Sequence, residues 1–193
     1  MRHRRSFGCA IVLFLTFLPA VANGFDGSRS GVYAGPSWGV GSIRLQGATV
    51  GQSGFNQIRF TDNGITGAFE IGYGVNESWQ VGIVQHAVWN LGIEDNLVVS
   101  QHGLGIRHYF SEQAPSMTLA GGIGLAVVYG NHPGSTGLGL WIESGCEIVK
   151  HWPIELGVSY SRFIDTIDTP FSLDYERKRE ILTCIVTFGY RAY

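Results

Sequence analysis

The chain has 193 residues, of which only 15% are charged, and it carries a formal net charge of −2. Soluble domains usually contain about 25% charged residues, so this composition indicates a surface that largely faces something other than water. Because there is no basic excess, the composition also argues against a nucleic-acid partner.

Residues 1–22 have the features of a secretory signal peptide. A basic start with three arginines precedes the apolar residues 11–18 (IVLFLTFL), and Ala20-Val21-Ala22 offers a small-x-small cleavage site. The apolar run is too short for a membrane-spanning helix. We therefore expect an exported domain of residues 23–193, which contains ten Lys and Arg against fifteen Asp and Glu.

Eight segments of the exported domain alternate between large apolar residues and small or polar ones. In residues 154–161, for example, Ile, Leu, Val and Tyr occupy the even positions, and Glu, Gly and Ser occupy the odd ones. Successive side chains of a strand point to opposite faces, and no comparable stretch has the 3.6-residue period of a helix. The expected strands are residues 32–44, 68–75, 79–87, 101–110, 118–129, 138–148, 154–161 and 182–191.

The face opposite the apolar one decides which kind of barrel these strands form. A soluble lipocalin-like barrel covers its exterior with charged residues, whereas a membrane barrel turns its apolar face to lipid. Here the second face is mostly Gly, Ala, Ser and Thr with a few isolated charges, which suits a narrow interior. A closed barrel also pairs all the backbone polar groups that lipid cannot satisfy. We predict an all-β fold, an eight-stranded antiparallel up-and-down transmembrane β-barrel.

The connections alternate between short turns and longer loops, as expected for a barrel of the bacterial outer membrane. Three short turns would face the periplasm together with both chain termini: residues 76–78, 111–115 and 149–153. The outer side would have four loops: residues 45–64, 90–96, 130–137 and 164–179.

Aromatic residues near the strand ends would form two girdles at the level of the lipid headgroups. Ordinary strand propensity is the simpler explanation for any single one of them, so the prediction depends on their joint placement. On the periplasmic side they are Tyr73, Trp79, Phe110, Trp152 and Tyr190, and on the outer side Trp89, Tyr129 and Tyr160.

Six charged residues fall on the inward face, where a charge is stable only when it is paired and hydrogen-bonded. Two interpretations of this lumen network stay open, a structural salt-bridge plug and a polar path that conducts. We expect the arginines to neutralise the carboxylates, with Glu70, Glu147 and Glu155 as candidate partners of Arg107. The six residues are Glu70, Arg107, Glu143, Glu147, Glu155 and Arg191.

Other chemically capable residues lack the pattern that a site would need. His86, Ser159 and Ser161 share the inward face and could form a hydrolytic set only with Asp165 or Asp168 nearby. A cation site at Asp165, Asp168 and Asp174 would lack the glycine turn and terminal glutamate of a calcium loop. We therefore predict no catalytic residue, no metal site and no cofactor.

The remaining histidines and cysteines also have simple explanations. His102 and His108 share the apolar face, near opposite ends of one strand, where a polar group can reach the membrane interface. Cys146 and Cys184 are separated by a whole strand, so we expect two free thiols that act as small apolar groups.

The exported domain contains segments such as EIGYGVNESWQVGI, in which a polar turn would join two strands. It resembles the small eight-stranded outer-membrane β-barrels typified by OmpA and OmpX, and the resemblance covers residues 23–193. Members of that family usually end on an aromatic residue in phase with the outward positions, whereas here Tyr190 is in phase and the terminal Tyr193 is not. The related lipid A deacylases carry a His-x-Ser pair on a late strand, and the equivalent stretch here, GVSYSRFID, has no histidine.

These observations leave three classes of function. The leading hypothesis is a non-enzymatic outer-membrane protein that supports envelope integrity or surface interaction through residues 45–64 and 164–179. The alternatives are a narrow pore or small-molecule conduit, and a lipid-modifying enzyme of the deacylase type. We expect a monomer whose partners are outer-membrane lipid, lipopolysaccharide and the outer-membrane assembly machinery.

Overall fold

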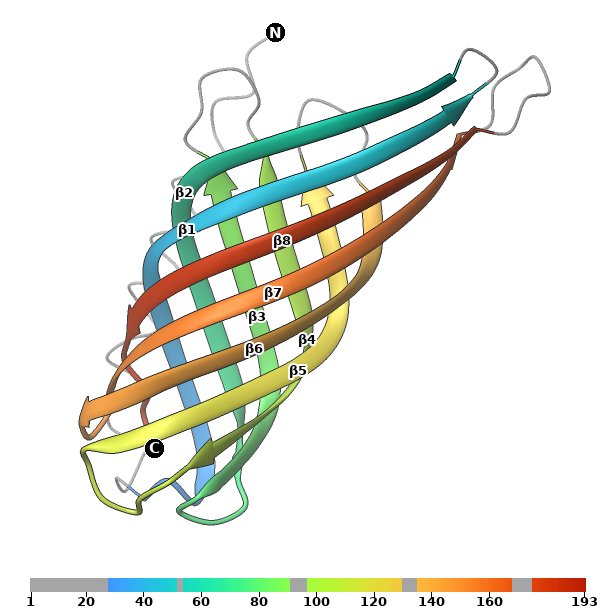
Figure 1. The fold of residues 1–193 in the computed structure, drawn as a ribbon. Helices are drawn as coiled ribbons and strands as arrows, with labels where there is room; N and C mark the ends of the chain where they lie inside the picture. Colours follow the sequence, from blue (N-terminus) through green and yellow to red (C-terminus); the bar gives the residue numbers. More distant parts are fainter. Residues whose placement is uncertain (1–27, 52–53, 91–96, 130–134, 168–174) are drawn as a thin grey trace, which may run out of the picture.

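Eight antiparallel strands form a closed barrel in the computed structural model, which describes residues 28–51, 54–90, 97–129, 135–167 and 175–193 (Figure 1). Each strand pairs with its neighbour in the sequence, and β8 closes the ring against β1. The predicted fold class is confirmed. The strands are β1 (Gly31–Gly51), β2 (Gly54–Gly74), β3 (Trp79–Asn90), β4 (Val98–Tyr109), β5 (Ser116–Tyr129), β6 (Ser135–Val149), β7 (Trp152–Ile167) and β8 (Tyr175–Gly189).

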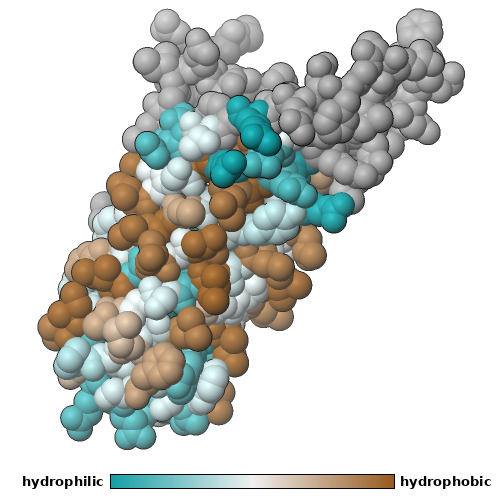
Figure 2. Space-filling model, in the orientation of Figure 1, coloured by the Kyte–Doolittle hydropathy of each residue, from teal (hydrophilic) through white to brown (hydrophobic). Residues whose placement is uncertain are grey.

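Large apolar side chains cover the outside of the barrel, as the alternation of the sequence predicted. Leu104 is 68% exposed and Val40 is 63% exposed, whereas inward residues such as Glu155 and Ser161 are buried. In Figure 2 the apolar residues gather along the barrel wall. A surface of this kind is unfavourable in water and matches the hydrocarbon core of a membrane. Within the described residues, no helix is long and apolar enough to cross a membrane.

Four neighbouring strands continue together beyond the point where the other strands end (Figure 1). β1 and β2 stay paired as far as Gly51 and Gly54, whereas the described pairing of β2 with β3 ends at Gly64. On the other side, β7 and β8 stay paired as far as Ile167 and Tyr175. We call residues 42–51, 54–63, 164–167 and 175–178 the four-stranded extension, and we call the two ends of the barrel the extension end and the turn end.

The extension corrects two of the predicted loops. Residues 45–51 and 54–64 are strand rather than loop, and so are residues 164–167 and 175–179. Asn90 likewise belongs to β3, and residues 135–137 belong to β6. Outside a membrane both faces of a sheet meet water, so the apolar alternation disappears although the backbone ladder continues. The rest of the predicted loop residues and the predicted signal peptide lie outside the described residues.

At the turn end, the observed turns agree better with those predicted from the sequence. The predicted turns at residues 76–78 and 111–115 both lie between strands. The third is shorter than predicted, because β6 ends at Val149 and β7 begins at Trp152. His151 in this turn has a positive φ of 79°, and its backbone N–H donates to the Glu147 side chain at 2.8 Å.

An apolar cluster fills the lumen near the extension end. The sequence interpretation expected only small residues and isolated charges inside, which was wrong for this region. Ala126 and Ile185 had inward parity in the expected strands, but Ile43, Val88, Val99, Phe163 and Ile181 lie at or beyond the ends of the expected strands, so the pattern gave little sign of a cluster. They are Ile43, Val88, Val99, Ala126, Val128, Phe163, Ile181 and Ile185.

The last residues of the chain continue the pairing with β1 in the register of β8, past its end at Gly189. Ala192 pairs with Ala34 of β1 through two backbone hydrogen bonds, of 2.8 and 3.1 Å. The flanking side chains of Arg191 and Tyr193 are both buried. This explains why Tyr193 is out of phase with the outward residues, since its ring belongs to the interior.

Val158→Lys should destabilise the barrel far more than Ser159→Ala. Val158 lies on the outward face of β7, where a cation costs about 2 to 4 kcal/mol near the bilayer midplane. Ser159 points inward and hydrogen-bonds to Thr183, a contact worth about 1 kcal/mol. Denaturant titration in lipid vesicles would measure both free energies of unfolding. Equal effects, or the reverse order, would mean that the faces of β7 are wrongly assigned.

Candidate functional site

Arg107 of β4 lies at the centre of a buried ion cluster in the lumen. One of its terminal nitrogens, Nη2, is 2.6 Å from Glu70 Oε1 and 3.4 Å from Glu143 Oε2. The other terminal nitrogen binds Glu155. Because the three carboxylates come from β2, β6 and β7, a single guanidinium joins four strands across the barrel.

Arg191 supplies a second guanidinium from the segment that follows β8. Its Nη2 atom donates to Glu155 Oε2 at 2.7 Å and to Glu70 Oε1 at 3.2 Å. Glu70 and Glu155 therefore each bind both arginines. The backbone pairing of Ala192 with Ala34 holds Arg191 where it can reach them.

His86 of β3 completes the charge balance of the cluster. Its Nε2 atom is 2.9 Å from Glu143 Oε1, and its ring meets Trp141 edge-on, with the ring centroids 5.8 Å apart. Three carboxylates face two guanidiniums, so the cluster is neutral only when His86 carries a proton. An unbalanced charge at this depth is costly, so the contact of His86 with Glu143 is part of what stabilises the cluster.

The same three carboxylates could in principle hold a cation, since ligand atoms of Glu70, Glu143 and Glu155 lie within 4.8 Å of one another. Their charge is already matched by two guanidiniums and an imidazole of the same chain. A divalent cation would have to displace these groups. The donor set is therefore that of an ion-pair network rather than a cation site.

A second buried ion pair lies nearer the turn end. Glu147 Oε2 accepts a hydrogen bond from Arg29 Nε at 3.0 Å, and Glu147 Oε1 accepts one from the Tyr193 hydroxyl at 3.2 Å. Arg29 also lies over the ring of Tyr109, 4.3 Å from its centroid. Glu147 was named as a candidate partner of Arg107, and the structure instead pairs it with Arg29.

Three residues in and around the Arg29–Glu147 pair were missing from the predicted lumen network, namely Arg29, Tyr109 and Tyr193. Arg29 precedes β1, so no strand alternation could assign it to the lumen. Tyr109 has the inward parity of β4 and could have been found from the alternation. Tyr193 is out of phase with the outward residues in the sequence, but only the structure shows its contact with Tyr109, with 2.7 Å between the hydroxyl oxygens.

The candidate hydrolytic residues are not brought together as a catalytic set. His86 binds Glu143, Ser159 hydrogen-bonds to Thr183, and Ser161 accepts a hydrogen bond from Gln101 Nε2 at 2.6 Å. Each hydroxyl thus has a partner other than the imidazole. The Asp165 side chain and the whole of Asp168 and Asp174 lie outside the described part of the structure.

The lumen is tightly packed around these residues. A cavity of about 10 Å³ lies among His86, Gln101, Ser159 and Thr183, which is about the room that one water molecule needs. The buried apolar cluster occupies the lumen on the extension side, and the buried ion pairs occupy it on the turn side. This packing favours the plug over the conducting path.

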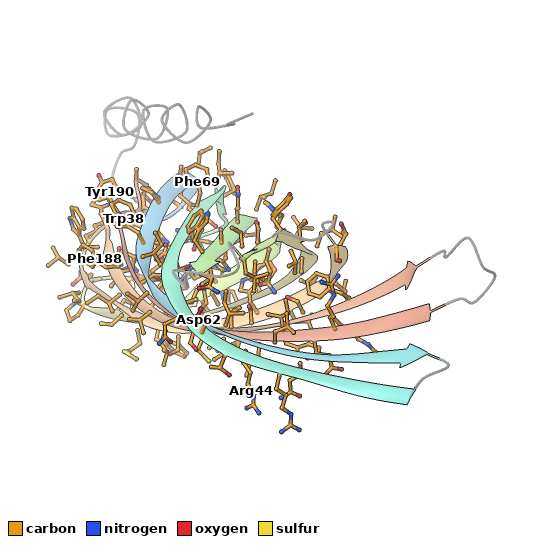
Figure 3. The ribbon with its side chains drawn as sticks, turned by 90° about the horizontal axis from the view of Figure 1, so that it is seen from above. Trp38, Arg44, Asp62, Phe69, Phe188 and Tyr190 are labelled. Carbon is orange, nitrogen blue, oxygen red and sulfur yellow. The ribbon has the colours of Figure 1, made fainter. Side chains whose placement is uncertain are left out.

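Aromatic side chains gather on the outward face at both ends of the barrel. At the turn end, the rings of Trp79 and His108 lie tilted against each other with 4.3 Å between their centroids, and Trp152 stacks on Phe188 with 5.3 Å between ring centroids. Figure 3 shows Phe188 and Tyr190 pointing away from the lumen. The girdle role of these aromatic residues stays a prediction. Of the other predicted members, Tyr73, Phe110, Tyr129 and Tyr160 are exposed and Trp89 is half-buried.

The other singled-out histidines and cysteines have local roles. His102 Nε2 is 2.7 Å from the Ser100 hydroxyl, and His108 Nδ1 is 3.1 Å from the backbone carbonyl of Ser78. Cys146 and Cys184 are free thiols, as the intervening strand predicted.

Comparison with known proteins adds to this geometry. No protein-family profile and no curated protein sequence matches the chain. Among solved structures, it is similar to the outer membrane protein OprG from Pseudomonas aeruginosa, with 13% identity over 88% of this chain and 99% of that one and a TM-score of 0.53. It is also similar to Ail, the attachment invasion locus protein of Yersinia pestis, with 15% identity over 84% and 99% of the two chains and a TM-score of 0.53.

The chain has the fold of the small eight-stranded outer-membrane β-barrels. This agrees with its apolar exterior and supports a location in an outer membrane. At such low identity the likeness concerns the fold alone, so any activity has to be argued from the chain's own residues.

Arg107→Met should strongly destabilise the barrel. The change leaves three buried carboxylates with one guanidinium fewer, and breaking a buried pair costs about 3 to 5 kcal/mol. Denaturant titration of the refolded protein would measure the loss. Lys150→Met, in an exposed turn, is the matched control and should be nearly neutral.

A double-mutant cycle identifies the partners of Arg107. Glu155→Gln should recover part of the loss caused by Arg107→Met, because the two side chains are in direct contact. Glu147→Gln should recover none of it, since Glu147 pairs with Arg29. Equal rescue by both changes would contradict the separation of the two ion pairs.

Glu77, in the turn between β2 and β3, should make stability depend on pH. Burial raises the pKa of Glu77, but hydrogen bonds from the Ser28 hydroxyl and the backbone N–H groups of Arg29 and Ser30 outweigh burial, so the pKa falls below its ordinary value of 4.5. The resulting stabilisation is complete above the unfolded-state pKa and disappears as the pH falls through the folded-state value.

Glu77→Gln should therefore lower stability at neutral pH and leave it unchanged in strong acid. Thermal unfolding of both proteins at a series of pH values would measure the difference. A constant difference between the two proteins down to about pH 2 would contradict this role of the carboxylate.

Proposed function

We propose that this chain is a non-enzymatic outer-membrane protein that acts at the cell surface through its four-stranded extension. The observation that carries the proposal is the continuous pairing of β7, β8, β1 and β2 beyond the other strands. These pairs are not needed to cross the membrane, and ordering them costs conformational entropy. An ordered sheet outside the membrane is a natural surface for contact with other envelope or external molecules.

The proposal includes an orientation. The turn end, with the short turns and the C-terminus, would face the periplasm, and the extension would face outward. Short periplasmic turns and longer external connections are the usual arrangement in such barrels. We expect the barrel to be monomeric and to be inserted by the outer-membrane assembly machinery.

The interior supports a role outside the lumen. The ion cluster around Arg107, the Arg29–Glu147 pair and the apolar cluster occupy successive levels of the barrel. The proposal accordingly assigns no catalytic step and no transport step to the chain. Ail, which shares the fold, has been solved in complex with a heparin analogue, sucrose octasulfate, so a surface ligand has a precedent in this fold.

Shortening the extension should separate folding from function. Because Gly47 lies opposite Ile58 in the β1–β2 ladder, residues 48–57 can be replaced by Asn-Gly, which forms a tight two-residue hairpin turn. We expect the shortened protein to keep the heat-dependent gel mobility of a folded barrel. We also expect cells that carry it to lose the detergent resistance or surface binding that the full chain confers.

Two outcomes would overturn the proposed surface role. One is unchanged resistance and binding in cells that carry the shortened protein. The other is steady conductance of the wild-type protein in planar bilayers that rises on Arg107→Met, because such a result would assign the function to the lumen.

A further inference from the structure

Two exposed arginines lie in one row across the four strands that form the extension. Arg162 of β7 is directly opposite Glu180 of β8, which is opposite Gln46 of β1, which is opposite Arg59 of β2. All four have the parity of the outward, lipid-facing residues on their strands. Neighbouring strands lie about 4.8 Å apart, so the row spans about 14 Å.

A third arginine lies in the next row toward the membrane. Arg44 of β1 is flanked by Leu182 of β8 and Thr61 of β2, and Leu182 is opposite Tyr160 of β7. Arg44 extends from the outer face of the sheet in Figure 3. On the outward face of the β1–β2 ladder, Arg44 and Arg59 are diagonal neighbours, about 7 to 8 Å apart.

The outward face becomes apolar between these rows and the middle of the barrel, across one intermediate row of Ser42, Asn63, Cys184 and Val158. Two rows further in, the four neighbouring positions on the same strands are all aliphatic and exposed, namely Leu156, Val186, Val40 and Ile65. In Figure 2 the most hydrophilic described residues gather at the upper end of the apolar wall. One surface therefore passes from aliphatic to cationic within a few residues.

Positive charge on the described surface is concentrated at this place. Among the side chains that the structure describes, the exposed Lys and Arg residues are Arg44, Arg59 and Arg162 here and Lys150 in a turn at the opposite end. Glu180 is the one carboxylate in the two rows, so three guanidiniums exceed it by two charges.

We propose that Arg44, Arg59 and Arg162 bind the phosphate groups of a glycolipid in the outer leaflet, whose acyl chains lie along the aliphatic rows below. Guanidinium groups form paired, charge-assisted hydrogen bonds with phosphate. A soluble anion would use only the charged row, whereas a phosphorylated lipid uses the charged and the aliphatic rows together. This inference rests on the proposed orientation, in which the extension faces outward.

Binding of defined lipids to the purified barrel tests the site. Native mass spectrometry in mixed micelles would count bound lipid A that carries two phosphates, one phosphate or none. We expect affinity to fall with each phosphate removed. The triple variant Arg44→Gln, Arg59→Gln, Arg162→Gln should bind the bisphosphorylated form about tenfold more weakly or worse, because it loses the charge-assisted hydrogen bonds from guanidinium to phosphate.

Matched controls make the result specific. Lys150→Gln removes an exposed cation at the other end and should bind lipid as the wild type does. Heat-dependent gel mobility would check that each variant is folded. If the triple variant does not fold, the single change Arg162→Gln should still weaken binding of the bisphosphorylated lipid.

Three results would overturn the inference. The first is unchanged lipid binding by the folded variants, and the second is equal binding of dephosphorylated lipid by the wild type. The third is a triple variant that loses binding of a soluble polysulfated sugar but still binds the bisphosphorylated lipid normally. The protein shortened at residues 48–57 keeps all three arginines. Normal lipid binding by that protein without surface activity would therefore separate this site from the proposed function.

Discussion

The contacts of Arg107 are the interaction on which the interior depends. An eight-stranded barrel is too narrow for a water-filled channel, so any charge inside it has to be neutralised by another side chain. Glu70, Glu143 and Glu155 come from three strands that do not pair with β4, and Arg107 binds all of them. The backbone ladder joins each strand only to its two neighbours, and this cluster adds the links across the lumen.

Because the interior is filled with side chains, the surfaces available for binding other molecules lie on the outside of the protein. The wall presents an aliphatic surface, two rows with arginines and then the four-stranded extension, in that order along the same strands. The strands on the far side, from β3 to β6, take no part in the extension. One side of an otherwise regular barrel is thus specialised, and the features that could distinguish this chain from others of its fold lie there.

Alternation predicted the membrane part of the fold well and the rest poorly, for a physical reason. Lipid outside and a narrow lumen inside impose opposite demands on successive residues, so Leu156, Val158 and Glu155 could be assigned to their faces from the sequence alone. In the four-stranded extension, successive residues no longer face these opposite demands. The sequence therefore predicted a loop at residues 45–51, which are strand. Parity assigned six charged residues to the inward face but not Arg29, which precedes β1 and pairs with Glu147. The partners of these charges could not be predicted, because register across the barrel has no trace in the sequence.

The position of Arg191 has a consequence for biogenesis. A chain that stops at residue 189 contains every strand and could close the ladder between β8 and β1, yet it would lack one of the two guanidiniums that Glu70 and Glu155 share. It would also lack the backbone pairing of Ala192 with Ala34 of β1 and the hydrogen bond from the Tyr193 hydroxyl to Glu147. The charge balance of the interior is therefore complete only once the segment after β8 has docked on β1, so the seam that closes the sheet and the ion cluster depend on each other.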